Sequence, residues 1–124
     1  MSRPRPKHLD LTKIRLPVPA LVSILHRASG AALFLCMPLL LWLWQESIAS
    51  QQRFDQLKAV ASQWAVKLVL IGLLWAYLHH LCAGIRHLAL DLHIGEELAA
   101  ARASSWTVLI VSLGLTAIVA LTVW

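Results

Sequence analysis

Residues 64–90 read WAVKLVLIGLLWAYLHHLCAGIRHLAL, an apolar stretch that carries three histidines and one arginine in its second half. A helix needs about 20 apolar residues to cross a bilayer, so this stretch predicts a transmembrane helix. Ionisable side chains are costly inside such a helix and usually face other protein or a ligand. The stretch therefore predicts both a membrane location and a functional face.

Two other apolar stretches, residues 21–44 and 106–124, are also long enough to cross a bilayer. Pro17 and Pro19 lie just before the first of these, where the missing N–H of proline is tolerated at a helix start. Pro38, inside it, predicts a local kink. We therefore expect an all-α membrane protein whose three transmembrane helices form part of a helical bundle.

The segments between the stretches are polar. Residues 45–63 form a loop in which Phe54, Leu57 and Val60, at helical spacing, predict a short interfacial helix. Residues 91–105 form the second predicted loop.

Positive charge is concentrated near the N-terminus, where residues 1–20 form a basic segment. Six of the eleven Lys and Arg residues lie in the first 27 positions. Such an excess is typical of the cytoplasmic flank of a membrane protein. We therefore expect a multi-pass membrane protein with the N-terminus and residues 91–105 on the cytoplasmic side and residues 45–63 outside.

Composition argues against the soluble classes. Of the 124 residues, 59% are hydrophobic and 14% are charged, whereas a soluble domain has about 25% charged residues. Mean hydropathy is +0.69 and the isoelectric point is about 9.9. The net charge of +5 is clustered rather than spread over a polar face, which argues against a nucleic-acid partner. Cys36 and Cys82 lie inside apolar stretches, so we expect neither a disulfide framework nor a zinc site.

The first polar cluster is SILHRASG, residues 23–30. Offsets of three, four and seven place Ser23, His26, Arg27 and Gly30 on one helical face. This face combines a hydroxyl, an imidazole and a permanent cation with a glycine that allows close approach. The alternative is that Arg27 snorkels to the lipid headgroups and Ser23 caps the helix.

The second polar cluster is a stripe formed by His80, Gly84, His87 and Asp91 on one side of the predicted helix. His80 lies about 16 Å from Asp91 along the axis, deep in the hydrocarbon. A small residue beside a histidine lets a flat, bulky group lie against the helix, and neutral imidazole is a common ligand of haem iron. The alternative is a histidine that forms a hydrogen bond with a neighbouring helix.

The other histidines limit the number of haem groups. His79 points about 100° away from His80, so the two cannot bind one iron, and we assign no role to His79. His93 has suitable spacing from His80 but lies beyond the predicted helix. We therefore expect one haem, and six-coordinate iron would require a histidine from another polypeptide.

These motifs occur together in a chain with three predicted spans, and the chain resembles the cytochrome b membrane-anchor subunits of succinate dehydrogenase (complex II). The resemblance covers almost the whole chain. It rests on Arg5-Pro6, Ser23-x-x-His26-Arg27-x-Ser29-Gly30 and His80-x-x-x-Gly84-Ile85-Arg86-His87-x-x-x-Asp91. Leu90 departs from the family pattern, which tends to have an aromatic residue or methionine there.

The resemblance implies a role for each matched position. His80 would be the axial ligand of haem b iron, with His26, Arg27 and His87 in the haem environment. Ser23 and Arg27 would line the ubiquinone pocket. The roles of His87 and Asp91 are less defined, and both would lie toward the inner surface.

The resemblance also implies a location in the bacterial inner membrane, partners, and a place in electron transport and the tricarboxylic acid cycle. A second membrane-anchor subunit would supply the other axial histidine. An iron–sulfur subunit would deliver electrons that a flavoprotein subunit takes from succinate, so the dicarboxylate chemistry is not on this chain. Ubiquinone rather than menaquinone is expected as the substrate on the same ground.

Two alternatives remain at the level of the sequence. The first is the anchor of a fumarate reductase, because such a subunit is compatible with electron flow in either direction. The second is a non-redox helical subunit of a transporter, in which Arg27 and His80 would form a proton or substrate path.

Overall fold

Helices account for most of residues 14–124, the part of the chain that the computed structural model describes. They are α1 (Val18–Ala49), α2 (Gln51–Ala61), α3 (Trp64–Asp91) and α4 (Leu98–Val123), and this part of the chain contains no strand. Much of the expected basic segment, including Arg5-Pro6, lies outside the described residues.

Three of the helices, α1, α3 and α4, are long and apolar enough to cross a membrane. This confirms the prediction of an all-α protein with three transmembrane helices. Helix α4 begins at Leu98, inside the segment that we expected to be a loop. Its first turns contain Ala99, Ala100 and Ala101, and alanine is the strongest helix former, so the helix starts before the apolar stretch does.

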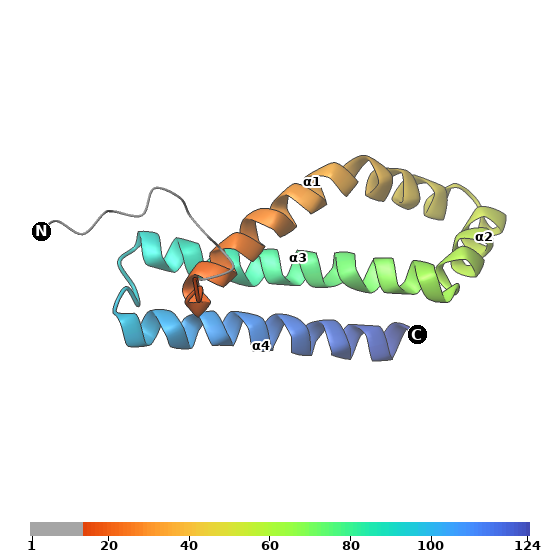
Figure 1. Ribbon diagram of the computed structural model, residues 1–124. Coiled ribbons are helices and arrows are strands. Elements are labelled where there is room, and N and C mark those ends of the chain that lie inside the picture. Colours follow the sequence, from red (N-terminus) through yellow and green to blue (C-terminus); the bar gives the residue numbers. More distant parts are fainter. Residues whose placement is uncertain (1–13) are drawn as a thin grey trace, which may run out of the picture.

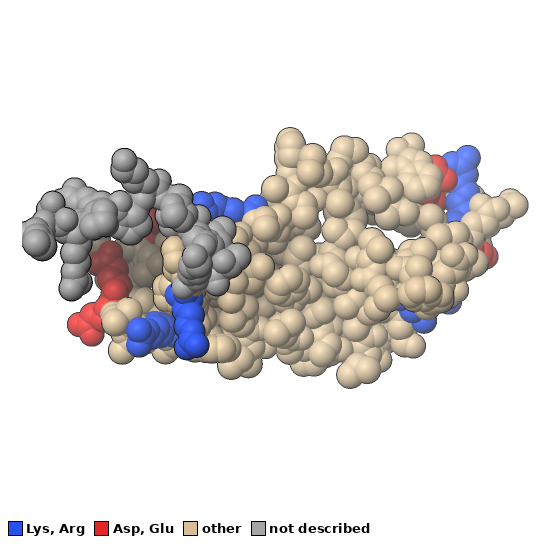
Figure 2. Space-filling model, in the orientation of Figure 1, with Lys and Arg blue, Asp and Glu red and all other residues tan. Residues whose placement is uncertain are grey.

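Helix α3 lies at the centre of the arrangement, with α4 antiparallel beside it and α1 crossing it (Figure 1). Helix α1 is close to both other spans at its N-terminal end and then leans away from α3. It changes direction in its second half (Figure 1), where Pro38 lies inside the helix and removes a backbone hydrogen bond. On the face shown in Figure 2, Lys, Arg, Asp and Glu gather toward the two ends of the molecule.

The interface between α3 and α4 is built from small and polar side chains. The buried residues are Ala76, His79, Ala83 and Arg86 on α3 and Ser105, Val108, Ser112 and Thr116 on α4. Small residues let helix backbones approach closely, which is the usual basis of packing in a bilayer. Most large apolar side chains are instead exposed on the isolated chain. Those side chains are available to contact lipid or other subunits.

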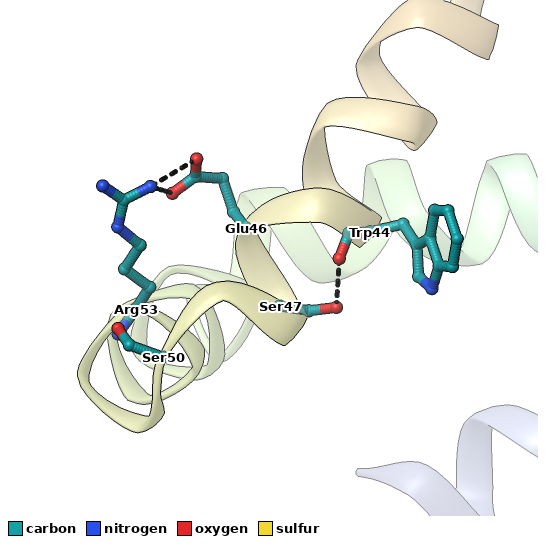
Figure 3. Close-up of polar contacts among 5 residues, drawn as sticks. All are labelled: Trp44, Glu46, Ser47, Ser50 and Arg53. Atoms are coloured by element: carbon teal, nitrogen blue, oxygen red, sulfur yellow. Dashed lines mark hydrogen bonds and ion pairs between the residues drawn. The ribbon is translucent and has the colours of Figure 1, made fainter.

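The junction of α1 and α2 is held by a helix cap and an ion pair (Figure 3). The Ser50 hydroxyl accepts a hydrogen bond of 3.2 Å from the Arg53 backbone N–H, so Ser50 is the N-cap of α2. The guanidinium of Arg53 reaches back to the Glu46 carboxylate at 2.8 Å and 2.9 Å. The two helices are thereby joined at a sharp turn.

Replacing Ser50 with alanine should loosen the first turn of α2. Loss of an N-cap costs about 1 kcal/mol, so hydrogen exchange at the Arg53 amide should become about fivefold faster. Ser47→Ala is the matched control, because the Ser47 hydroxyl donates to the Trp44 carbonyl within α1 and caps nothing. Equal exchange rates at Arg53 in the two variants would contradict the assignment of Ser50 as the cap.

Candidate functional site

Two glycines allow α1 and α3 to approach closely where the helices cross. A Cβ atom at Gly30 of α1 would lie 2.7 Å from Cε1 of His80, which is too close for the ring to stay in place. A Cβ atom at Gly84 of α3 would lie 3.5 Å from Nε2 of His26, an ordinary contact. The arrangement is reciprocal, because the histidine of each helix lies against the glycine of the other.

Hydrogen bonds at this crossing identify the proton position on His80. Its Nδ1 lies 3.0 Å from the backbone carbonyl oxygen of His26 on α1. A carbonyl oxygen can only accept, so Nδ1 carries the proton and donates it. The Ser29 hydroxyl also donates to the His26 carbonyl at 3.0 Å, and its oxygen is 3.3 Å from Nδ1.

The other ring nitrogen of His80 is available for a ligand. In the Nδ1–H tautomer, Nε2 bears a lone pair, and it has no hydrogen-bond partner among residues 14–124. The alternative of a histidine bonded to a neighbouring helix is thus confirmed for Nδ1. This hydrogen bond does not involve Nε2, so it is compatible with a role of Nε2 as a ligand atom.

A cavity of about 390 Å³ lies beside His80, in the wedge between α1 and α3. Its lining is apolar apart from the histidine and a tyrosine, and consists of Gly30, Leu33, Phe34, Met37, Leu40, Tyr77 and His80. The wedge widens where α1 leans away from α3 (Figure 1). The cavity can accept a flat apolar group, and a second polypeptide could close its open side.

Three imidazoles are grouped beside this cavity. The rings of His26 and His80 are stacked, with centroids 4.2 Å apart and planes inclined by 7°. The His87 ring lies next to His26, with the two ring centroids 4.9 Å apart and the ring planes inclined by 48°. The structure thus brings His26, His80 and His87 together, although they belong to two helices.

Ser23 and Arg27 lie on α1 toward the N-terminal end of that helix. The Arg27 guanidinium is exposed, and its Nε donates to the Ser23 carbonyl at 3.4 Å. Helix α1 begins at Val18 with Pro17 as its N-cap residue, so the alternative that Ser23 caps the helix is wrong. Both polar groups are therefore available to a ligand or a partner at this level.

His79 and Asp91 do not join the imidazole group. His79 is fully buried, and its ring centroid is 5.2 Å from that of Trp75. It lies near the Val22 backbone, but neither ring nitrogen makes a hydrogen bond of good geometry within residues 14–124. Asp91 is exposed at the last residue of α3.

Sequence reasoning gave no role to two residues that the structure distinguishes. Ser29 is buried against the His26 carbonyl and the His80 ring; its position three residues after His26 was the available signal. Arg86 is also buried, and its Nε donates to the Ser104 hydroxyl at 2.9 Å. Hydropathy alone could not reveal this, because an arginine near the end of a span ordinarily extends toward the headgroups.

Comparison with known proteins gives a consistent family. The family model for the succinate dehydrogenase/fumarate reductase transmembrane subunit matches residues 1–119. The chain is 45% identical to the succinate dehydrogenase cytochrome b556 subunit of Coxiella burnetii, over 100% of the chain and 98% of that protein. It is 36% identical to the subunit of the same name in Paracoccus denitrificans (84% and 78%) and 35% identical to that of Rickettsia felis (93% and 88%).

The two glycines at the crossing should respond differently to alanine. Gly30→Ala should displace the His80 ring and lower the free energy of unfolding in bicelles by about 1–3 kcal/mol, as overpacking does. Gly84→Ala is the control, because its new Cβ would meet His26 at an ordinary distance; its stability should stay within about 1 kcal/mol of the parent protein. Equal losses in the two variants would contradict the close contact at Gly30.

Proposed function

The chain belongs to the family of succinate dehydrogenase and fumarate reductase transmembrane subunits, and on that premise we propose that it is the cytochrome b anchor of a succinate:quinone oxidoreductase. In this role it binds haem b and helps to form the site where ubiquinone is reduced. The observation that carries the proposal is the His80 imidazole, which has its Nδ1–H held by α1 and its Nε2 free beside a cavity.

The residues at the crossing fit a haem group. An axial ligand needs a neutral imidazole with a free lone pair, and a hydrogen bond from the other ring nitrogen fixes the tautomer and raises the basicity of the ligand. His80 meets both conditions through the His26 carbonyl. The cavity beside His80, with its largely apolar lining, leaves room for a flat macrocycle. When bound, haem b supplies a one-electron redox centre.

The remaining histidines and Arg27 suit the polar edge of such a group. Haem carries carboxylate side chains, which need cations or N–H donors. His26 and His87 stand beside His80 in the direction of the α3 C-terminus, and Arg27 provides a permanent positive charge on α1. We assign these three residues to the haem environment.

Ser23 and Arg27 are proposed to bind the quinone. Reduction places negative charge on the quinone carbonyl oxygens, and a hydroxyl and a guanidinium fixed nearby stabilise that charge. The two residues stand one helical turn apart and are joined through the Ser23 carbonyl. Arg27 thus serves both ligands, since it lies on the turn of α1 that also carries His26.

The proposal requires other subunits. A second membrane anchor would supply another histidine to the haem iron and would close the wedge between α1 and α3. An iron–sulfur subunit delivers electrons from a flavoprotein that oxidises succinate. The basic N-terminal segment favours a cytoplasmic N-terminus. With that orientation, the Ser23 and Arg27 end of α1 faces the subunits that deliver electrons.

The direction of electron flow has one alternative, an anchor of fumarate reductase, because the family description covers both enzymes. The names of the three relatives above favour succinate oxidation. Family membership gives no support to a non-redox transporter subunit. A haem b content of one per copy of this chain would distinguish a cytochrome anchor from such a transporter subunit. A colourless complex with all subunits present, after adequate haem supply, would favour the transporter.

Replacing His80 with alanine should remove the haem ligand. In the assembled complex, haem absorbance per copy of this chain should fall by about tenfold or more, and free imidazole should restore part of it. His79→Ala should keep the haem, because the His79 ring is fully buried near the Val22 backbone and does not line the cavity, although the substitution should lower stability as a core truncation does. Loss of haem in the His79 variant alone would identify His79, and not His80, as the haem ligand.

Removing the quinone donors should separate two activities of the complex. Ser23→Ala and Arg27→Ala should each lower the rate of succinate-dependent ubiquinone reduction, by about 100-fold for the more important donor. Succinate oxidation with a soluble artificial acceptor should be unchanged. Ser47→Ala, at the other end of α1, is the control and should keep both activities. A parallel loss of both activities would indicate failed assembly and would not support a quinone site.

A further inference from the structure

We propose that the groove between α3 and α4 at the loop end binds an anionic phospholipid, whose phosphate pairs with Arg86. The site is separate from the haem and quinone positions. Ala89, on its lining, is nine residues after His80 and so lies about 180° around α3. The inference does not depend on the proposed function.

The groove is a second cavity, of about 370 Å³, and its lining comes from α3, α4 and the segment between them, with no residue of α1. Its α3 wall includes Cys82, Ile85 and Ala89, which recur at helical spacing, and its α4 wall includes Thr107 and Val108. Most of this lining is apolar, as an acyl chain requires. Arg86, Ser104 and Thr107 contribute its polar side-chain groups.

Arg86 is a buried cation without a carboxylate partner in the described chain. Only 8% of the Arg86 surface is accessible to solvent. Nε donates to the Ser104 hydroxyl at 2.9 Å, and Nη2 makes a long bond of 3.4 Å to the Ala101 carbonyl. Both partners are neutral, and the ion pairs within residues 14–124 do not include Arg86. A buried charge is costly unless an opposite charge offsets it.

The Ala101 carbonyl is also a poor partner because it is shared. The Ser104 and Ser105 hydroxyls donate to the same oxygen at 3.2 Å and 2.7 Å. The other N–H groups of the guanidinium have no partner among residues 14–124. A planar guanidinium with free N–H groups matches the oxygens of a phosphate.

The location of Arg86 matches that of lipid phosphate. It lies five residues before Asp91, the last residue of α3, which is about 7.5 Å along the axis and near the boundary between hydrocarbon and headgroups. The N-terminus of α4 adds to the positive potential, because Glu97 makes no side-chain cap and the first backbone N–H groups are free of helical partners. Ala100, in this first turn, lines the groove.

The neighbouring carboxylates favour a lipid over a free anion. Glu96 is paired with His93 at 2.8 Å, and Glu97 and Asp91 are exposed near the same end. Their negative charge opposes the entry of a small anion. A phospholipid gains additional stabilisation from its acyl chain in the apolar part of the groove.

Native mass spectrometry of the purified, delipidated complex tests this site. Dioleoylphosphatidylglycerol should bind to the parent complex, and Arg86→Gln should raise the dissociation constant of the tightest lipid by about tenfold. Arg102→Gln is the matched control, because Arg102 is exposed on α4 near the same end; it should bind like the parent. Haem absorbance should be unchanged in both variants, which separates this result from any failure of the proposed function.

A groove variant and two other probes complete the test. Ala89→Trp fills the groove without removing the cation, so it should weaken lipid binding as Arg86→Gln does. This variant keeps the test possible even if the Arg86 variant fails to assemble. Dioleoylphosphatidylcholine and inorganic phosphate should each bind at least tenfold more weakly. Equal binding of inorganic phosphate would indicate a free-anion site and overturn the lipid assignment. An unchanged lipid affinity in both the Arg86 and Ala89 variants would overturn the site itself, as expected if a subunit carboxylate pairs with Arg86.

Discussion

The hydrogen bond from Nδ1 of His80 to the backbone carbonyl of His26 links α3 to α1 at the point on which the site depends. It fixes the ring orientation and tautomer, and so leaves Nε2 with a free lone pair. In a bilayer, such a bond is strengthened by the low dielectric, and loss of the acceptor would leave a buried donor unsatisfied. The bond is possible only because Gly30 lets the imidazole lie against the α1 backbone, while Gly84 receives His26 in return.

This constraint also explains the division of α3 into faces with different chemistry. One face carries the stacked imidazoles and the cavity. A second face carries the buried stripe that includes His79 and Ala83, and Ala83 packs with Val22 of α1 and Val108 of α4. The groove that contains Arg86 borders this second face, between α3 and α4. Successive residues on a helix point about 100° apart, so His79 and His80 can serve different neighbours although they are adjacent in sequence.

Much of the architecture could be predicted because a bilayer imposes a length and a polarity on each span. The stripe through His80, Gly84 and His87 followed from helical periodicity alone. The acceptor for His80 could not be predicted, because a backbone carbonyl leaves no signature in a sequence. Hydropathy likewise did not predict that α4 begins at Leu98, because helix propensity rather than apolarity determines where this helix begins. Burial of Arg86 depends on the position of Ser104 across the helix pair, which only the packing reveals.

The α3–α4 interface and the crossing with α1 bury few apolar side chains; in residues 14–124 the buried ones are Val22, Ala76, Ala83 and Val108. The isolated chain therefore gains little stability from its own interior, and most of its helical surface is left for contact with lipid or other subunits. A newly inserted copy that finds no companion subunits would stay loosely packed and open to membrane proteases. Cellular levels of this protein should consequently follow the synthesis rate of its companions, with any surplus degraded.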